Sequence, residues 1–322
     1  MKKLALLLAA LSVASVSYAK EVMPEAAPVV EEAPVVEQEV VEVKAAPVLR
    51  VTSVGQELVV ENKSNANDRG YEDVGDAIHL KNKVGLALGD SWTFDLMARK
   101  TWSASIDDNE VLATGEKTGS GMKSKAHRIE LAATRHFENF SLGLRWRGEK
   151  NQDAIFLPVS YNYGMVSGWF DPAYYFVNES KGQDYFYLEA EPVVLSYGPV
   201  QLAYYFEGYK WTGEGDGNVP TDTKSDYAHQ ARLRGTVYSN DAFSVGLEYR
   251  YQFAQDVEMV NGNKNVENNR HIGVLSGAYN VTENLTLAGY YQYEFNKYEQ
   301  HEGTAMDDDY YGEFGLGWTY NF

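Results

Sequence analysis

The last thirteen residues, 310 to 322, have the sequence YYGEFGLGWTYNF, in which apolar and polar side chains alternate. Successive side chains of a β-strand point to opposite faces. One face would therefore hold Phe314, Leu316 and Trp318, and the other would hold Tyr311 and Glu313. The first face suits lipid and the second suits water. The closing strand of a transmembrane β-barrel requires this distribution, although the terminal strand of a soluble sandwich has the same period.

The chain begins with MKKLALLLAALSVASVSYAK, which combines two lysines, an apolar run from Leu4 to about Val16 and small residues before Lys20. This pattern predicts a secretory signal peptide over residues 1–19, and hence export through the periplasm. No later segment reaches the ~20 consecutive apolar residues that a transmembrane helix needs, so a membrane location would require a barrel. The lack of cysteine excludes a disulfide framework and thiolate metal sites.

Residues 20–50 repeat Ala, Pro, Val and Glu and contain no aromatic residue. Prolines at positions 24, 28, 34 and 47 break any long helix. We therefore predict a semi-extended acidic tether on the periplasmic side. The sequence leaves open whether this tether meets the cell wall or a neighbouring subunit.

From residue 51 to 322, tight polar turns alternate with longer Gly, Asn and Asp-rich segments, separated by runs of roughly 10 to 14 residues. Barrel strands need ~9 to 11 residues to cross the hydrocarbon layer. Short turns are expected at 89–90, 138–139, 165–168, 198–199, 240–241 and 282–284. Longer connections are expected at 63–76, 104–123, 150–153, 180–184, 212–225, 256–267 and 300–308. This rhythm predicts an all-β fold, an antiparallel up-and-down transmembrane barrel of about 14 strands with the longer loops outside the cell.

Alternation along individual strands supports this fold class. In FSVGLEYRYQF, Phe243, Leu247 and Tyr249 share one face, while Glu248 and Arg250 share the other. Strands that contain Pro158, Pro172 or Pro192 fit less well, because proline removes a hydrogen-bond donor from the ladder and requires a bulge or a place near the rim. Tryptophans at 92, 102, 146, 169, 211 and 318 are expected in aromatic girdles at the two membrane interfaces.

The same alternation assigns charged side chains to the inner face of the predicted barrel. The predicted pore-lining residues are Lys81, Lys83, Asp95, Arg99, Arg128, Glu130, Arg145, Arg147, Glu189, Glu191, Glu207, Arg232, Arg234, Glu248, Arg250, Glu294 and Glu313. Because unpaired buried charges are costly, an interior with so many is either water-filled or fully paired. We favour the water-filled interior, in which opposed basic and acidic walls would orient polar solutes. A salt-bridged plug without flow is the alternative.

Charge and motifs limit the other functions. The net charge of −18 at pH 7 is concentrated in the tether and the loops and disfavours nucleic acid as a partner. The sequence indicates no metal site and no cofactor. It has no zinc-protease helix motif, no G-x-S-x-G elbow and no phosphate loop. We therefore expect no enzyme, although His127 and His229, near the outer ends of strands on lipid-facing positions, leave a barrel lipid-modifying enzyme as an alternative.

The leader MKKLALLLAA, the linker EAAPVVEEAPVVEQEVVE and the ending GWTYNF together resemble the fusobacterial major porin family, the FomA-like outer-membrane proteins. Oligogalacturonate-type porins, described with twelve strands, are less similar. The first resemblance implies an outer-membrane location and a weakly selective diffusion pore. It also implies a homotrimer and an adhesive role for surface loops that contact host or bacterial ligands. A surface adhesin or structural barrel acting through loops 104–123 and 212–225 is the alternative function.

The aromatic ending further resembles the signal that the barrel-assembly machinery of bacterial outer membranes recognises. We predict that Trp318, Tyr320 and Phe322 form this signal, with Phe322 at the periplasmic rim. The expected partners are therefore that machinery, outer-membrane lipid and lipopolysaccharide.

Overall fold

The computed structural model describes residues 48–64, 73–103, 122–178, 182–212, 223–262, 264–300 and 309–322. The predicted signal peptide and nearly all of the predicted tether lie outside these ranges. Among the described residues, no helix has both the length and the apolar character needed to cross a membrane.

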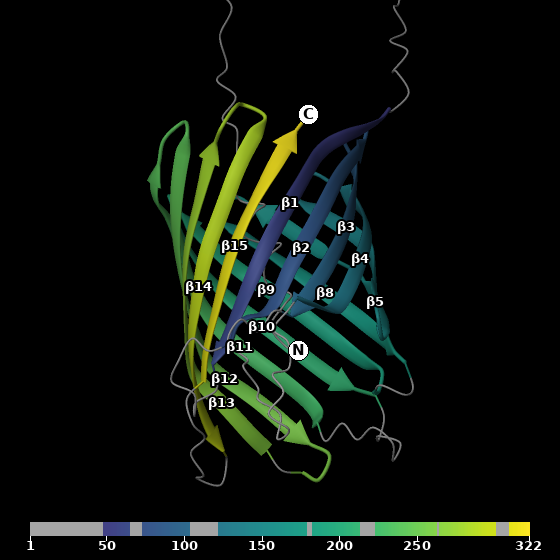
Figure 1. Ribbon diagram of the computed structural model, residues 1–322, viewed down its shortest axis with the longest axis vertical. Coiled ribbons are helices and arrows are strands. Elements are labelled where there is room, and N and C mark those ends of the chain that lie inside the picture. The colour runs from purple at the N-terminus through teal and green to yellow at the C-terminus, as the bar shows by residue number, and fades with distance from the viewer. Residues whose placement is uncertain are drawn as a thin grey trace, which may run out of the picture. The chain divides into compact units, whose positions relative to one another are not determined.

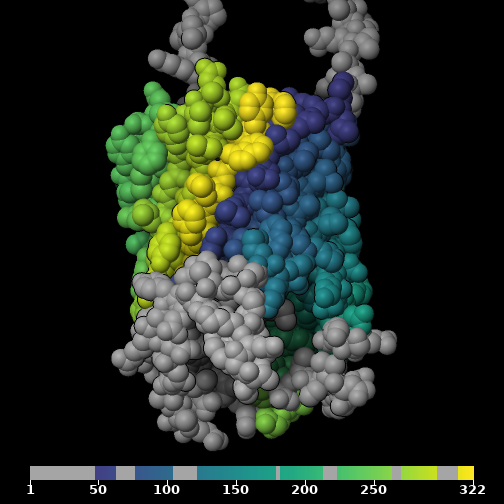
Figure 2. Space-filling view, viewed as in Figure 1, coloured from purple at the N-terminus to yellow at the C-terminus, as the bar shows by residue number. Residues whose placement is uncertain are grey.

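The described residues form one antiparallel sheet that closes on itself (Figure 1). Its strands are β1 (Leu49–Ser64), β2 (Asp73–Leu88), β3 (Trp92–Ser103), β4 (Lys123–His136), β5 (Phe140–Glu149), β6 (Gln152–Phe156), β7 (Val159–Tyr163), β8 (Val166–Val177), β9 (Tyr185–Tyr197), β10 (Val200–Trp211), β11 (Thr223–Ser239), β12 (Phe243–Met259), β13 (Lys264–Asn280), β14 (Leu285–Gln300) and β15 (Asp309–Asn321). Closure occurs between the first and last strands, where Val54 is opposite Tyr320 and Leu58 is opposite Leu316. Figure 2 shows β1 (purple) beside β15 (yellow) at this seam.

The segments β6 and β7 together fill one position in the barrel, because both pair with β5 on one side and β8 on the other. The interruption lies at Leu157 and Pro158. Pro172 lies opposite it, and the Pro172 carbonyl accepts a hydrogen bond from the Leu157 N–H at 2.9 Å. Proline has no backbone N–H to donate, and Pro172 stands where the hydrogen-bond ladder is already interrupted. The prediction of a closed 14-strand antiparallel barrel is therefore confirmed.

Pro192 lies beside irregularities in both of its ladders, between Ser167 and Trp169 on β8 and between Tyr204 and Phe206 on β10. The bulge required at this proline is present. A proline can stay inside a closed barrel only where the regular pattern of donors is interrupted.

Short turns join the strands at the rim where the chain ends. Gly198, in the turn between β9 and β10, has a φ of 58°, a conformation that strains residues with a side chain. The turn after β11 is closed by the Asn240 side chain, whose Oδ1 accepts hydrogen bonds from the backbone N–H groups of Ala242 and Phe243 at 3.0 and 2.7 Å. Asparagine is favoured in turns for this reason.

Two predicted boundaries were wrong. The turn predicted at 165–168 is centred on Gly164 and Met165, and β8 already begins at Val166. The connection predicted at 256–267 is much shorter, because β12 extends to Met259 and β13 begins at Lys264. Strands β11, β12 and β13 have 17 residues each, longer than predicted, because the backbone ladder continues past the apolar part of each strand.

The outer face has a band of exposed leucines that oppose one another across neighbouring strands. Leu96 lies opposite Leu131, and Leu247 lies opposite Leu275. The exposed leucines of the band are Leu58, Leu96, Leu131, Leu142, Leu144, Leu195, Leu202, Leu233, Leu247, Leu275, Leu287 and Leu316. So large a continuous exposed apolar surface would be unfavourable in water and matches the lipid-facing band of a membrane barrel.

Candidate functional site

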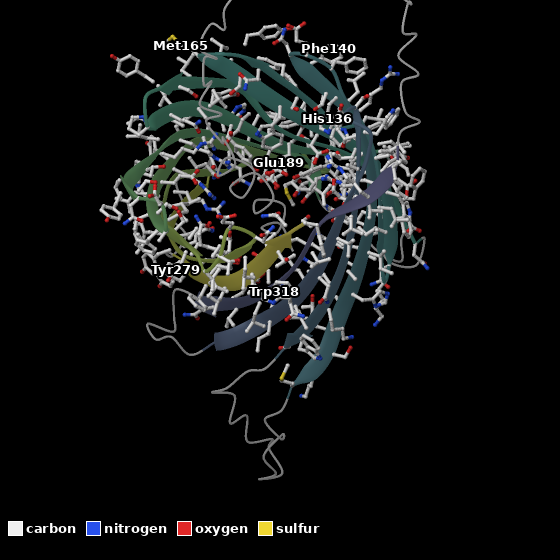
Figure 3. All side chains as sticks on the ribbon, turned by 90° about the horizontal axis from the view of Figure 1, so that it is seen from above. His136, Phe140, Met165, Glu189, Tyr279 and Trp318 are labelled. Carbon is white, nitrogen blue, oxygen red and sulfur yellow. The ribbon has the colours of Figure 1, made fainter. Side chains whose placement is uncertain are left out.

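The inner wall of the barrel is the candidate functional site. Figure 3 shows Glu189 directed into the barrel, whereas Phe140, Met165, Tyr279 and Trp318 project outward. On β12, Leu247 and Tyr249 are exposed on the outside, while Arg250 and Gln252 are buried. Side chains alternate between the two faces along each strand, and the pairing of neighbouring strands keeps the inward positions side by side. Charged and amide side chains therefore form one continuous inner surface.

A basic cluster occupies the inner faces of β3, β4 and β5. The Arg147 Nε donates to Glu130 Oε1 at 2.7 Å, and its Nη1 donates to the Tyr175 hydroxyl at 2.6 Å. Arg145 forms an ion pair with Asp171. Its guanidinium carbon also lies 4.1 Å from the centre of the Phe156 ring.

Two further arginines in this cluster share one carboxylate. Arg128 forms an ion pair with Glu149, and Arg99 Nη2 lies 3.7 Å from the same carboxylate. The predicted basic wall is thus interleaved with acids, and its field is weaker than the arginines alone would produce.

A second cluster centres on Glu191, whose side chain is fully buried. Its Oε1 accepts from Arg232 Nη1 at 2.9 Å, and its Oε2 accepts from Arg234 Nη2 at 2.8 Å. The Arg232 guanidinium also lies 3.4 Å from the centre of the Tyr205 ring, a cation–π contact. One carboxylate therefore anchors two arginines from β11.

A third cluster lies on β12, β13 and β14. Arg250 donates to both carboxylate oxygens of Glu248, at 2.7 and 3.0 Å. Glu294 pairs with Arg270, at 2.9 Å from Nε. Bidentate contacts of this kind fix the orientation of the guanidinium plane as well as its position.

The fourth cluster lies on β1 and β2. Glu57 accepts from Lys83 Nζ at 2.9 Å and from Lys81 Nζ at 3.4 Å. The Lys83 side chain keeps 31% of its accessible surface, and Arg234 keeps 23%. These two cations are therefore the better placed of the paired inner-wall bases to meet a solute.

Three inner-wall glutamates, Glu189, Glu207 and Glu313, accept hydrogen bonds from tyrosine hydroxyls. Glu189 accepts from Tyr187 at 2.8 Å and from Tyr205 at 3.0 Å. Glu313 accepts from Tyr311 at 2.7 Å and also from Tyr290. Within the described ranges, no lysine or arginine nitrogen lies within 4.0 Å of these two carboxylates or of Glu207.

The strand registers place all of the predicted pore-lining residues on the inner face. Of these, Asp95 is the most open to solvent, and Arg99, Glu130, Arg147, Glu189, Glu191, Arg232, Arg250, Glu294 and Glu313 are buried within the wall. Whether they line a path for solutes stays a prediction.

Several partners in these clusters were missed in the sequence. They are Glu57, Glu61, Glu149, Asp171 and Arg270. Glu149 and Asp171 lie next to a predicted loop or a proline, where the period was hard to assign. Extending the alternation from Arg145 and Arg147 through residue 149 would have found the first of them.

Two tryptophans expected in the outer girdles are on the inner wall instead. The Trp169 Nε1 lies 3.4 Å from Glu191 Oε2, and the Trp211 ring stacks on inward-facing Tyr209. Trp169 is in phase with inward-facing Asp171 and Tyr175 on β8, and Trp211 follows the unbroken alternation of β10.

Histidines were weighed as catalytic groups. His229 lies on the outer face with Nδ1 at 2.7 Å from the Tyr204 hydroxyl and ring contacts to Phe206 and Phe253. His79 on the inner face lies between Thr101 and Glu61, at 2.8 and 2.7 Å. Because Thr101 and His79 are each 3% exposed, the hydroxyl is not accessible to a substrate. We interpret this triad as a buried polar network.

The predictions about a metal site, the adhesive loops and the carboxyl-terminal signal concern residues that the structure describes only in part. The described side chains contain no group of three or more His, Asp or Glu residues placed to hold a metal ion. The loops predicted to act in adhesion, 104–123 and 212–225, lie almost wholly outside the described residues. At the carboxyl end, the Phe322 backbone N–H donates to the Thr52 carbonyl at 3.0 Å and its ring is exposed.

The comparisons with known proteins found matches only among solved structures. No family model and no curated protein matches the chain. A bacterial polysaccharide outer membrane secretin is 11% identical, with a TM-score of 0.49 over 84% of this chain and 98% of that one. The trimer form of OmpT from Vibrio cholerae is 11% identical, with a TM-score of 0.45 over 86% and 100%. The anion-selective porin from Comamonas acidovorans is 13% identical, with a TM-score of 0.39 over 85% and 100%.

Proposed function

We propose that the chain is an outer-membrane porin, through which small hydrophilic solutes and ions diffuse passively. The observation that supports this proposal is the distribution of side chains over the closed sheet. Leucines such as Leu202, Leu247 and Leu316 are exposed on the outside, while the inside holds charged and amide groups. A soluble barrel would bury the leucines, and a membrane barrel with a polar lumen exposes them to lipid.

The number of strands provides room for solutes. A barrel of 14 strands with strands ~4.8 Å apart and tilted by ~40° has a backbone radius of about 14 Å. Inner side chains of ordinary length reach about 6 Å from the wall, so those on opposite sides do not meet at the axis. This estimate favours the water-filled interior over the salt-bridged plug.

The ion pairs on the wall agree with a wet interior. Arginine and carboxylate groups pair along the wall, within one strand or across one or two strands, as Arg250 does with Glu248 and Arg232 with Glu191. Pairing along the wall fixes the side chains against it and leaves the axis free. A plug would instead need contacts between opposite sides of the barrel.

The proposal also includes the cellular location, the oligomeric state and the role of the inner wall. The amino-terminal signal sequence directs the chain out of the cytoplasm, and the leucine band then requires the outer membrane. The resemblance of the leader, linker and ending to fusobacterial major porins supports this location and a trimer of identical subunits. The inner wall serves to conduct, and the proposal includes no catalytic step.

Liposome swelling tests the proposal. Purified full-length protein is reconstituted into vesicles, which are then diluted into isotonic solutions of sugars of increasing size. Swelling should be fast with a monosaccharide and fall steeply with an oligosaccharide of four or more units. The proposal would be refuted if the vesicles stayed impermeable to the monosaccharide although the protein in them is folded. Folding is checked by the change in gel mobility on boiling.

A further inference from the structure

Three aromatic rings form a patch on the inner wall, at the rim opposite the short turns. Tyr185 lies at the start of β9, and Tyr209 and Trp211 lie at the end of β10. The Tyr185 and Trp211 ring centres are 5.8 Å apart, and the Tyr209 and Trp211 rings stack at 5.9 Å. All three side chains are half-buried, so each ring keeps part of its surface open, although Tyr185 stacks on Tyr175 with ring centres 4.4 Å apart.

A carboxylate lies next to this aromatic patch. The Tyr209 hydroxyl donates to Glu207 Oε1 at 2.7 Å, and Glu207 is itself partly exposed. Below it, the Tyr205 hydroxyl lies 3.1 Å from Glu207 Oε2 and 3.0 Å from Glu189 Oε1, so that the two carboxylates share one tyrosine. The register places Glu207 directly opposite Glu189.

Charge distinguishes this place from the rest of the wall. Glu57, Glu130, Glu191 and Glu248 each have a lysine or arginine at ion-pair distance. Within the described ranges, Glu207 and Glu189 have only hydroxyl donors. The aromatic patch therefore lies beside two carboxylates that have no lysine or arginine nitrogen at ion-pair distance among the described residues.

We propose that Tyr185, Tyr209, Trp211 and Glu207 form a binding site for organic cations with an ammonium group. The proposal deepens the porin function, on which it rests, by naming a solute class for this part of the wall. An ammonium group is attracted to the faces of tyrosine and tryptophan rings within ~6 Å of their centres. Glu207 adds an ionic partner for the same group.

Other ligand classes fit less well. A neutral sugar can stack on the rings but gives the Glu207 carboxylate no cationic partner. A Ca²⁺ ion needs 6 to 8 oxygen ligands, whereas the ring faces offer none. A bulky ammonium group uses both the rings and the carboxylate. A site this open binds weakly, with a dissociation constant on the order of 1 mM, which lets the ion leave again.

Calorimetry on the full-length protein in detergent tests the site without requiring conduction. Choline chloride is the probe, and sodium chloride and glucose are the controls. The protein should bind choline in the millimolar range, and Glu207→Gln and Trp211→Leu should each weaken binding about 5-fold or more. Trp211→Phe, which keeps an aromatic face, should retain most of the affinity.

Glu313→Gln is the matched control, because Glu313 is also held by two tyrosine hydroxyls but on β15. This variant should bind choline like the unaltered protein. Absence of choline binding up to 50 mM by folded protein would overturn the proposal, as would equal loss in Glu207→Gln and Glu313→Gln. Vesicles that do not swell while choline still binds would refute the porin function and leave the cation site standing.

Discussion

Glu191 on β9 and Arg232 on β11 meet at 2.9 Å across an intervening strand, β10. The Arg232 guanidinium covers the ring of Tyr205, which belongs to that intervening strand. The ion pair therefore bridges three strands and holds an aromatic side chain beneath it. This arrangement joins the wall across the stretch where the β9 to β10 ladder is irregular, between Tyr204 and Phe206.

Replacing Glu191 should destabilise the barrel. Glu191→Ala leaves Arg232 and Arg234 without their carboxylate, and breaking a buried pair from one side costs about 3 kcal/mol or more. The urea midpoint of unfolding, measured by tryptophan fluorescence in vesicles, should fall accordingly. Glu283→Ala, in an exposed turn, is the control and should leave the midpoint unchanged. Equal midpoints for both variants would show that the bridge adds no stability.

A charge on the leucine band should prevent stable insertion. Leu247 is half exposed on the outer face of β12, and an arginine at the middle of the lipid-facing surface costs about 2 to 4 kcal/mol. Leu247→Arg should therefore lower the folded fraction in vesicles, whereas Glu283→Arg should not. If Leu247→Arg folds as well as the unaltered chain, the leucine band does not face lipid.

Reversing an accessible inner-wall cation should change ion selectivity. Lys83→Glu introduces a negative charge beside Glu57, at a position where the side chain now keeps 31% of its surface. Cation preference should rise, and the reversal potential in a KCl gradient should move toward the potassium equilibrium value. Arg145 and Arg147 are less suitable for this test, because Glu130 and Asp171 hold them. An unchanged reversal potential would place Lys83 away from the ion path.

Removing the terminal aromatic residue should affect assembly more than stability. Phe322 is 70% exposed, and the centre of its ring lies 5.0 Å from that of Tyr320. Deletion of Phe322 should lower the amount of folded protein in cells but leave refolding into vesicles nearly unchanged. Equal losses in both settings would mean that Phe322 contributes to the barrel itself and not to recognition by the assembly machinery.

The architecture could be predicted because period-two alternation is a property of each strand alone. Leu247 and Arg250 needed only their neighbours in sequence to be assigned to opposite faces. Partners such as Asp171 for Arg145 depend on which strands meet and in which register, which a single strand does not encode. Trp169 is in phase with inward-facing Asp171 on β8, but its pairing with Glu191 depends on the register beside the bulge at Pro192, whose position follows from pairing on both sides of β9.

The central claim is that the barrel encloses a continuous aqueous path, and single-channel recording in a planar lipid bilayer tests it most directly. Purified protein added to a bilayer in 1 M KCl should produce discrete current steps whose size is proportional to voltage near zero. An electrically silent bilayer, with folded protein inserted as judged by protease protection, would contradict the claim.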